Sequence, residues 1–223
     1  MIVEFYGLPC SGKSTSVKEL LQQCEQSVDI MKYRKEVKKI KIFRYVFTIE
    51  FIRFFFLLIP LFFKKKHKRK YDIKVFYLFC CIYLRYMFCR NNSTYSIYFN
   101  DHGAVQNIVS ALWDDEKSTK YGEKITYYFC SHFKNELLFV YTDNPDNKKL
   151  FSAVKQRGNR IRLYFLPQNE AYRVMDSQRH IMETMTSTVE KYSPYIKVST
   201  LCSKDKSVAE IFDFITKNVQ QVE

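Results

Sequence analysis

Residues 7–15 read Gly-Leu-Pro-Cys-Ser-Gly-Lys-Ser-Thr, and they constrain this chain more than any other part of it. The full pattern Gly-x-x-x-x-Gly-Lys-Ser of a phosphate-binding loop (P-loop) is formed by Gly7, Gly12, Lys13 and Ser14. An apolar run at residues 2–6 precedes the loop, and a stretch with helical periodicity, residues 14–24, follows it. This is the context in which such a loop joins a buried parallel strand to a helix, so the sequence predicts an α/β protein.

Each conserved position of the P-loop pattern has a role in binding a triphosphate and its metal ion. The backbone N–H groups of the loop and the start of the following helix form a concave site for phosphate oxygens. Lys13 would neutralise the β- and γ-phosphates, and Ser14 would offer its hydroxyl to Mg²⁺. We therefore expect a nucleoside triphosphate with magnesium to contact Gly7, Leu8, Pro9, Cys10, Ser11, Gly12, Lys13, Ser14 and Thr15.

Apolar runs and helical stretches alternate along the rest of the chain. Strands are predicted at residues 2–6, 27–33, 95–100, 136–141 and 195–200. Helices are predicted at 14–24, 35–63 with a break near Pro60, 71–89, 103–113, 121–133, 147–157, 168–191 and 207–220. Asn144-Pro145-Asp146 is expected to be the turn and cap before the helix at 147–157. Strands that alternate with helices imply a parallel sheet covered on both faces, a three-layer fold.

The positive charge of the chain is concentrated in its middle. Of the net charge of +13, residues 31–90 hold 17 Lys or Arg against 3 Asp or Glu, so the remaining residues are close to neutral. Sixteen Phe or Tyr lie between residues 41 and 90. We interpret the chain as a single domain, residues 1–223, that carries a basic, aromatic-rich helical insertion at residues 31–94. The basic run at 64–70 is expected to be a solvated linker.

The sequence favours a cytoplasmic protein with possible membrane association. The most apolar stretch, residues 54–63, has ten residues, whereas a membrane-spanning helix needs about 20. The chain leads directly into the loop with no secretory signal. Its seven cysteines form no Cys-x-x-Cys pair, which favours reduced buried thiols over disulfides or zinc.

Asp101 is the next candidate for a chemical role. It ends an apolar run in Tyr-Phe-Asn-Asp-His-Gly, where a carboxylate would meet the water shell of the metal ion. Capping of the helix at 103–113 is the alternative, and in a kinase Asp101 could also take the proton of the acceptor. His102 could donate to a phosphate or be a plain turn residue, and Gln106 and Asn107 could face the acceptor pocket.

A basic segment follows the fourth predicted strand and its helix. It reads Lys155-Gln156-Arg157-Gly158-Asn159-Arg160-Ile161-Arg162, with four basic residues around a glycine. Arginines that a closing lid brings to the γ-phosphate stabilise the charge of phosphoryl transfer. We predict a lid at residues 155–168, with Arg157 and Arg160 in catalysis and Arg162 on the nucleotide. A solvated basic helix end is the alternative.

With these elements in this order, the chain resembles P-loop nucleoside and nucleotide kinases of the thymidylate kinase type. It looks closest to kinase-like proteins encoded in surface-polysaccharide gene clusters. The resemblance rests on the loop at 7–15, the strand ending in Asp101-His102-Gly103, and Phe-Val-Tyr-Thr-Asp-Asn-Pro followed by Lys-Gln-Arg-Gly-Asn-Arg. It implies a five-stranded parallel sheet with the loop-bearing strand central, a lid after the fourth strand, ATP as donor, and a base-contacting loop near residues 199–204.

Two departures from that family concern the acceptor. The Asp-Arg pair usual in thymidylate kinases is Asp101-His102 here, so the arginine that grips an acceptor phosphate is missing at this position. Residues 31–94 replace the acceptor-binding region, and they are more apolar and basic than a nucleotide pocket needs. Both departures weaken the expectation of a nucleoside monophosphate acceptor.

The sequence motifs favour some functions of P-loop proteins over others. A regulatory GTPase is disfavoured because no Asn-Lys-x-Asp motif occurs, and residues 146–149 read Asp-Asn-Lys-Lys instead. A transporter or motor ATPase is disfavoured because no Ser-Gly-Gly signature occurs. The favoured function is an ATP-dependent small-molecule kinase whose unidentified acceptor could be a sugar, a nucleotide or a lipid-linked glycan.

The basic middle segment leaves two further interpretations open. The alternative to a kinase is a nucleotide-binding protein with little transfer activity that docks through residues 31–94 on an anionic membrane or a partner. Nucleic-acid binding through the same charges is unlikely, because clustered Phe favours lipid or a helical core. Phe-rich helices that pack against one another as core are favoured over membrane contact.

Overall fold

The computed structural model describes residues 1–30, 44–63, 70–92, 94–113, 115, 118–199 and 204–220. Among these residues, five strands form one sheet in the order β2-β3-β1-β4-β5, and every pairing is parallel. The strands are β1 (Ile2–Tyr6), β2 (Ser27–Asp29), β3 (Ile97–Asn100), β4 (Leu137–Asp143) and β5 (Tyr195–Ser199). The prediction of a five-stranded parallel sheet with the loop-bearing strand in the centre is confirmed.

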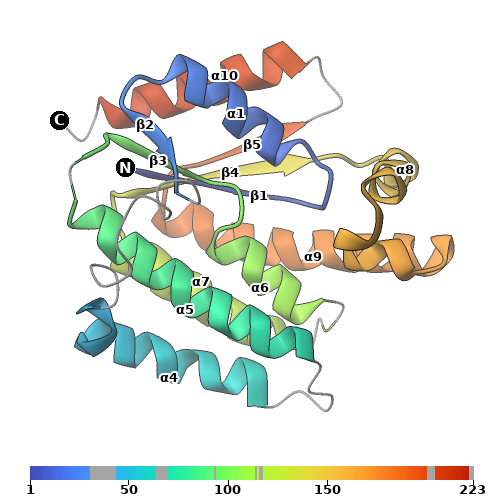
Figure 1. Ribbon diagram of the computed structural model, residues 1–223, viewed down its shortest axis with the longest axis horizontal. Coiled ribbons are helices and arrows are strands. Elements are labelled where there is room, and N and C mark those ends of the chain that lie inside the picture. The colour runs from blue at the N-terminus through green and yellow to red at the C-terminus, as the bar shows by residue number, and fades with distance from the viewer. Residues whose placement is uncertain are drawn as a thin grey trace.

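Helices cover both faces of this sheet (Figure 1). One face carries α1 (Lys13–Gln23) and α10 (Lys204–Val219), and the other carries α5 (Lys70–Arg90), α6 (Ala104–Leu112), α7 (Thr119–His132) and α9 (Gln168–Tyr192). α8 (Asn147–Arg157) lies beyond the carboxyl ends of the strands. The fold is the predicted three-layer α/β fold of P-loop nucleoside triphosphatases.

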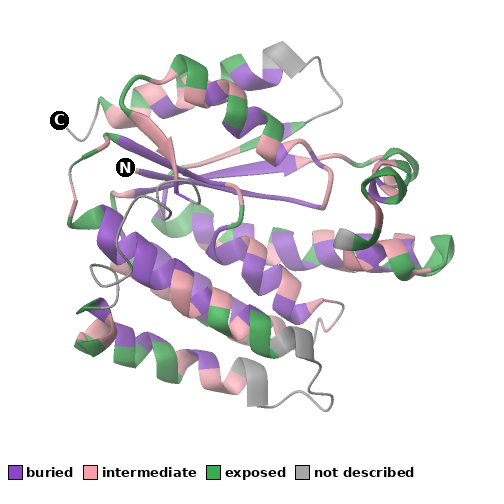
Figure 2. Cartoon of the chain, in the orientation of Figure 1, coloured by how far each residue is buried: buried purple, intermediate pink, exposed green. Residues whose placement is uncertain are grey.

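The central strand shows why both faces must be covered. All five residues of β1 are buried, and they alternate between the two sides of the sheet. Val3 and Phe5 join the core under α1 and α10, whereas Ile2 and Tyr6 join the larger core under α6, α7 and α9. Figure 2 shows this strand buried along its length. Glu4 shares the side of Ile2 and Tyr6, so the strand also buries one carboxylate.

Most predicted helices and strands are present with small shifts at their ends. Of the strand predicted at 27–33, residues 27–29 form β2, Ile30 is already outside it, and residues 31–33 lie outside the described residues. The cap predicted before α8 is confirmed, since the Asp146 carboxylate accepts from the Lys149 N–H at 3.0 Å. The predicted base-contacting loop lies mainly at residues 200–203, outside the described residues.

The helix predicted at residues 35–63 is only partly confirmed. A short 3-10 helix, η1 (Arg44–Phe47), precedes α4 (Ile49–Phe63), and residues 31–43 lie outside the described residues. The predicted break at Pro60 is wrong, because α4 continues through it. A proline removes the hydrogen bond to the carbonyl four residues earlier. That carbonyl belongs to Phe56, which is 63% exposed, so water can replace the lost donor.

α4 forms an extra layer on the helices below the sheet (Figure 1). Its main contacts are with α5, α7 and η1. Its inner face is aromatic core: the Phe54 ring stacks on Tyr83 of α5 at 4.4 Å and meets Phe129 of α7 edge-on at 5.1 Å. The prediction that the Phe-rich helices pack against one another is therefore confirmed for this face.

The outer face of α4 is different. Large apolar side chains remain exposed there, at the end of η1 and on the neighbouring start of α5: Phe47, Ile49, Ile52, Phe55, Phe56, Ile73 and Tyr77. We call these seven residues the outer apolar face. No helix in the described part of the chain is long and apolar enough to cross a membrane. The basic run at 64–70 falls on residues 64–69, outside the described residues, except that Lys70 begins α5.

A Phe→Ala substitution should lower the free energy of unfolding strongly on the inner face of α4 and very little on its outer face. Phe54 is fully buried, so Phe54→Ala should lower the free energy of unfolding by about 3–5 kcal/mol through lost burial and a residual cavity. Phe56→Ala, on the exposed face of the same helix, should change it by no more than about 0.5 kcal/mol. Urea denaturation of both variants measures this, and equal losses would contradict the placement of α4.

Candidate nucleotide-binding site

The loop at residues 7–15 follows the carboxyl end of β1 and turns into α1. Gly7 has a φ of 151°, and a Cβ added to it would lie 2.2 Å from the Thr142 carbonyl oxygen of β4, so only glycine fits. Gly12 has a φ of 92° and starts α1. The Thr15 and Ser16 N–H groups both bond to the Gly12 carbonyl, at 2.9 and 3.0 Å. The first turn of α1 is thus formed directly at the loop.

Lys13 points back over the loop. Its Nζ donates to the carbonyl oxygens of Gly7 and Leu8, both at 2.8 Å, and its side chain is buried. Burial lowers the pKa of Lys13 to about 8, and the nearby Asp101 carboxylate acts in the opposite direction. An ammonium group held in this way is stabilised by any further negative charge, and a bound phosphate would supply it.

Ser14 and Asp101 meet across two strands. The Ser14 hydroxyl donates to the Asp101 carboxylate at 2.5 Å. Asp101 directly follows β3, and β3 pairs with β1, so the ends of these neighbouring strands bring the two oxygens together. A hydroxyl beside a carboxylate is the hard-oxygen environment that Mg²⁺ prefers. The pair predicted from the sequence to meet the metal ion is therefore placed together and suits it.

A buried carboxylate ties the helices to this end of the sheet. Glu4 accepts from the Tyr86 hydroxyl of α5 at 2.7 Å and from the Val105 N–H at the start of α6 at 2.6 Å. The Asn100 side chain of β3 donates to the same Tyr86 hydroxyl at 2.9 Å. Burial raises the pKa of Glu4 to about 7, although Tyr86 and the amides of α6 favour its ionised form. β1, β3, α5 and α6 thus meet at one carboxylate.

α6 contributes polar side chains to the same region. The Gln106 side-chain carbonyl accepts from the Gly7 N–H at 3.1 Å, so it supports the loop directly. The Asn107 side chain donates to the carbonyl oxygens of His102 and Gly103, at 3.1 and 2.7 Å, and fixes the turn after β3. Both residues, singled out in the sequence, border the cavity described below.

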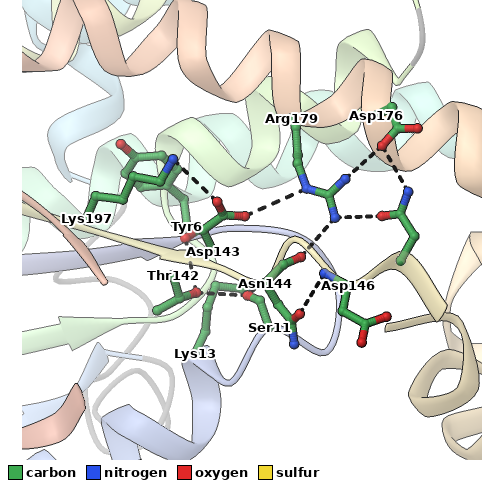
Figure 3. A network of polar contacts seen from close by, with 11 residues as sticks. Tyr6, Ser11, Lys13, Thr142, Asp143, Asn144, Asp146, Asp176, Arg179 and Lys197 are labelled. Atoms are coloured by element: carbon green, nitrogen blue, oxygen red, sulfur yellow. Dashed lines mark hydrogen bonds and ion pairs between the residues drawn. The ribbon is translucent and has the colours of Figure 1, made fainter. Parts of the chain in front are cut away.

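A second polar network attaches the loop to β4 and α9 (Figure 3). The Ser11 hydroxyl is 2.8 Å from that of Thr142 on β4. One residue further, Asp143 forms ion pairs with Arg179 of α9 at 3.7 Å and with Lys197 of β5 at 3.3 Å. Arg179 also donates to the Asn144 carbonyl at 2.8 Å, which holds the turn before α8 against α9.

A cavity of about 360 Å³ opens beside the loop. Residues 9–14 form one wall and α6 another, through Gln106, Asn107 and Ser110. Trp113, at the end of α6, and Gln178 of α9 also line it. α5 supplies a third wall, from Lys74, Val75, Leu78, Ile82 and Arg85. The cavity therefore continues well beyond the loop itself.

The predicted lid segment closes the last side of this cavity. α8 ends at Arg157, and two 3-10 turns, η3 (Gly158–Arg160) and η4 (Arg162–Phe165), follow before α9. Arg157 lines the cavity. Burial raises the pKa of the Cys10 thiol and the charge of Arg157 opposes this rise, whereas burial lowers the pKa of Lys13 and the charge of Arg157 adds to that effect. Arg157 therefore faces the loop.

Of the other two arginines of the segment, only Arg162 has a side chain that the structure describes. Arg162 lies over the Trp113 ring at 3.8 Å and donates weakly to the Ser110 carbonyl at 3.5 Å, so it borders the cavity beside the end of α6. The predicted site residue Arg160 has a side chain that lies outside the described part of the chain.

Comparison with known proteins agrees with this architecture. No known protein family matches the sequence, and no curated protein matches it significantly. Among solved structures, deoxyadenosine kinase from M. mycoides with the products dCMP and a flexible dCDP bound has a TM-score of 0.58 at 14% identity, over 97% of this chain and 100% of that one. The same kinase with bound dATP gives 0.54 at 15% identity, with the same coverage. The YorR protein from Bacillus subtilis, in complex with phosphorylated GDP, gives 0.51 at 13% identity, over 97% and 96% of the two chains. At these identities the likeness shows the fold alone, a P-loop fold that this chain shares with these proteins.

Sequence reasoning missed several residues of the site. Glu4, the single charge in an apolar strand, was a visible signal of a buried polar network. Arg85 was another, because it is the only charged residue between Val75 and Cys89 in an otherwise apolar helix. Trp113 and Gln178 carried no such signal, because their roles depend on how the helices cross.

Glu4 predicts a pH-dependent stability. Its raised pKa means that the folded protein binds a proton between about pH 4.5 and 7 that the unfolded chain releases, so this group contributes stability at low pH that is lost as pH rises through 7. Relative to Glu4→Gln, the wild-type free energy of unfolding should fall by on the order of 3 kcal/mol between pH 4.5 and 8.

Denaturant titrations of both proteins at several pH values test this. Glu190→Gln, which removes an exposed carboxylate, is the matched control and should leave the pH dependence of the wild type unchanged. A constant difference between wild type and Glu4→Gln across this range would contradict the raised pKa.

Proposed function

We propose that this protein is an ATP-dependent phosphotransferase that moves the γ-phosphate to a small-molecule acceptor. The observation that carries the proposal is the cavity that continues from the loop into a space walled by α5, α6 and the segment after α8. A nucleotide switch needs a site for the triphosphate only. A continuous second compartment beside the phosphates is what transfer to a second substrate requires.

The donor half would use the residues of the loop. The backbone N–H groups of residues 7–15 and the start of α1 would hold the phosphate oxygens, with Lys13 close to the β- and γ-phosphates. Ser14 and Asp101 would hold Mg²⁺, which when bound neutralises charge on the transferring phosphate. The fold likeness to the deoxyadenosine kinase from M. mycoides, solved with dATP and with dCTP bound, is consistent with a nucleoside triphosphate in this half.

The lid segment would complete the charge stabilisation. Residues 155–168 would bring Arg157, and with it Arg160, to the oxygens of the transferring group, where fixed positive charge lowers the barrier. Arg157 already faces Lys13 across the loop. Arg162 would contact the nucleotide from its position over Trp113. Asp101 could in addition accept a proton from a hydroxyl acceptor.

The acceptor half would be built by the insertion at residues 31–94. Its helix α5 supplies one wall of the cavity, and α4 backs α5 from outside. The neighbours of this fold include a kinase named for a nucleoside, which supports a nucleotide-like acceptor among the candidates. The thymidylate kinase branch and the likeness to proteins of polysaccharide gene clusters remain predictions from the sequence.

Transfer of label from γ-labelled ATP to panels of nucleosides, nucleotides, sugars and lipid-linked glycans tests the proposal. We expect the label to reach one class, and Lys13→Ala to reduce transfer by at least about 100-fold because the charge on the transferring phosphate is no longer neutralised. Lys18→Ala, an exposed lysine on α1, is the matched control and should keep full activity. If ATP and GTP both fail to raise the thermal stability of the wild type, the nucleotide site itself is wrong.

A second candidate function follows from the outer apolar face. Seven exposed Phe, Ile and Tyr side chains next to a run of six basic residues at 64–70 favour docking on an anionic membrane, where aromatic rings insert and Lys or Arg stay at the headgroups. In this function, nucleotide binding with little transfer would serve localisation or regulation.

Flotation with vesicles of anionic lipid separates the two candidates. If the outer apolar face inserts, the wild type should float with the vesicles, and Ile52→Glu with Phe56→Glu should abolish flotation because two buried charges oppose insertion. Arg53→Gln, between them on the exposed side of α4, should weaken it only slightly. Flotation that survives the double substitution would refute the insertion of these rings.

A further inference from the structure

Trp113 has a backbone conformation that a bulky residue rarely adopts. It follows α6 with a φ of 60° and a ψ of −88°, close to the rare and strained form of the γ-turn. Its N–H still bonds to the Val109 carbonyl at 2.8 Å, so the residue closes the last turn of the helix. Glycine is the usual residue where φ is positive. A bulky residue persists there only where surrounding contacts fix it, and such positions cluster at functional sites.

One contact of the Trp113 side chain comes from the segment after α8. The Arg162 guanidinium lies over the indole ring, with its carbon 3.8 Å from the ring centroid, well within the range of a cation–π contact. The same group donates to the Ser110 carbonyl at 3.5 Å, in the last turn of α6, where the helix dipole favours a cation. Arg162 is thus held against the end of α6 by a ring and by a carbonyl.

The segment that carries Arg162 is attached to α8 on its other side. Arg162 begins η4, and the Lys155 ammonium of α8 donates to the Tyr164 carbonyl of η4 at 2.5 Å. The same ammonium lies over the rings of Phe151 and Tyr164, 4.9 Å from both centroids. η4 is therefore bound to α8 through Lys155 and to α6 through Arg162. Trp113 and Arg162 both line the cavity, so this second attachment lies at the cavity wall.

We propose that Trp113 is a positioning residue that holds Arg162 at the cavity wall for the bound nucleotide. This inference rests on the proposed function, in which Arg162 contacts the nucleotide, and it adds the residue that places this arginine. An arginine side chain has several rotatable bonds, and restricting it before the ligand arrives lowers the entropy cost of the contacts that it then makes. Affinity for the nucleotide is therefore expected to depend on a ring that is part of α6 and not of the loop.

The geometry of stacking suits this role. The indole ring engages the face of the guanidinium and not the N–H donors at its edge. The same group can therefore stack on Trp113 and donate to an oxygen, as it does to Ser110. An oxygen of a phosphate or a ribose is the kind of acceptor that such a donor binds.

The alternative role of Trp113 is to fill space at the end of α6. In that role any large apolar side chain would serve, and leucine would replace the ring as well as phenylalanine does. If the π-electrons of the ring attract the guanidinium, phenylalanine should keep most of the effect and leucine should not. The two substitutions therefore distinguish positioning from packing.

Fluorescence tests the contact without any ligand, because Trp113 is the single tryptophan of the chain. Arg162 covers one face of the indole ring, so Arg162→Ala should increase the quenching of its emission by acrylamide. Lys191→Ala, which removes an exposed cation from α9, is the matched control and should leave the quenching unchanged. Equal quenching of the wild type and Arg162→Ala would show that this arginine does not cover the ring, and would overturn the inference.

Calorimetric titration with ATP and Mg²⁺ tests the positioning role. Trp113→Leu should raise the Kd for ATP by about threefold to tenfold, as expected for the loss of one cation–π contact. Trp113→Phe should stay within about twofold of the wild type, because the ring face is kept. Tyr127→Leu, which removes an exposed ring from α7, is the matched control and should bind ATP as the wild type does. Trp113→Met takes the place of the leucine variant if thermal melting shows that the latter does not fold.

A double substitution shows whether Trp113 acts through Arg162. In a protein that already carries Arg162→Ala, Trp113→Leu should cause no further loss of ATP affinity, because the group that the ring positions is gone. A further loss as large as that in the wild type would mean that Trp113 acts independently of Arg162, and would overturn the inference.

ATP binding to the wild type separates this inference from the proposed function. If ATP binds the wild type and Trp113→Leu with the same affinity, the positioning role is wrong and the nucleotide site stands. If the leucine and phenylalanine variants lose affinity equally, Trp113 fills space and the positioning role is again wrong. If ATP does not bind the wild type, the proposed function fails and this inference fails with it, while the quenching experiment still shows where Arg162 lies.

Discussion

The close approach of two backbones at Gly7 and Thr142 is the constraint on which the site depends. The two residues end neighbouring strands, and a side chain on Gly7 would overlap the Thr142 carbonyl oxygen. Because the loop is pressed against β4 here, the Ser11 and Thr142 hydroxyls also meet. From β4 the same connection continues through Asp143 to Arg179 of α9 and to the turn that starts α8. The loop and the turn that starts α8 are thus joined by one continuous chain of contacts.

Charge is distributed over the site according to burial. The ionisable groups that hold the architecture, such as Glu4, are enclosed by donors from several elements. The cationic side chains that line the cavity come from the loop, from α5, from the end of α8 and from the segment after it. They place positive charge on several sides of the space where the proposed nucleoside triphosphate would bind.

The sequence predicted the parts of the fold that short-range patterns control. The loop at 7–15, the apolar strands and the cap at Asp146 all depend on residues close together in the chain, and the structure has them where expected. The helix across Pro60 was not predicted, because its tolerance depends on the exposure of Phe56, a property of the packed molecule.

The side chains around the cavity show the same limit. The position of Asp101 near the loop could be predicted, because it directly follows an apolar run typical of a core strand. Arg85 could not be assigned, because only the crossing of α5 over the strand ends brings it to the cavity. The excess of positive charge and aromatic residues was visible in composition, but its division between an inner wall and an outer apolar face required the helices to be placed.

The hydrogen bond between Tyr86 and Glu4 joins α5, which lines the cavity, to the strand that carries the phosphate loop. Occupants of the two halves of the cavity would consequently be thermodynamically linked wherever binding in one half changes the strength of this bond. Such linkage is reciprocal: whatever factor the acceptor imposes on the affinity for the nucleotide, the nucleotide imposes on the affinity for the acceptor. The order in which the two substrates bind would then depend on α5 as well as on the loop. A substitution at Tyr86, which lines neither half of the cavity, would change the affinities for the nucleotide and for the acceptor together.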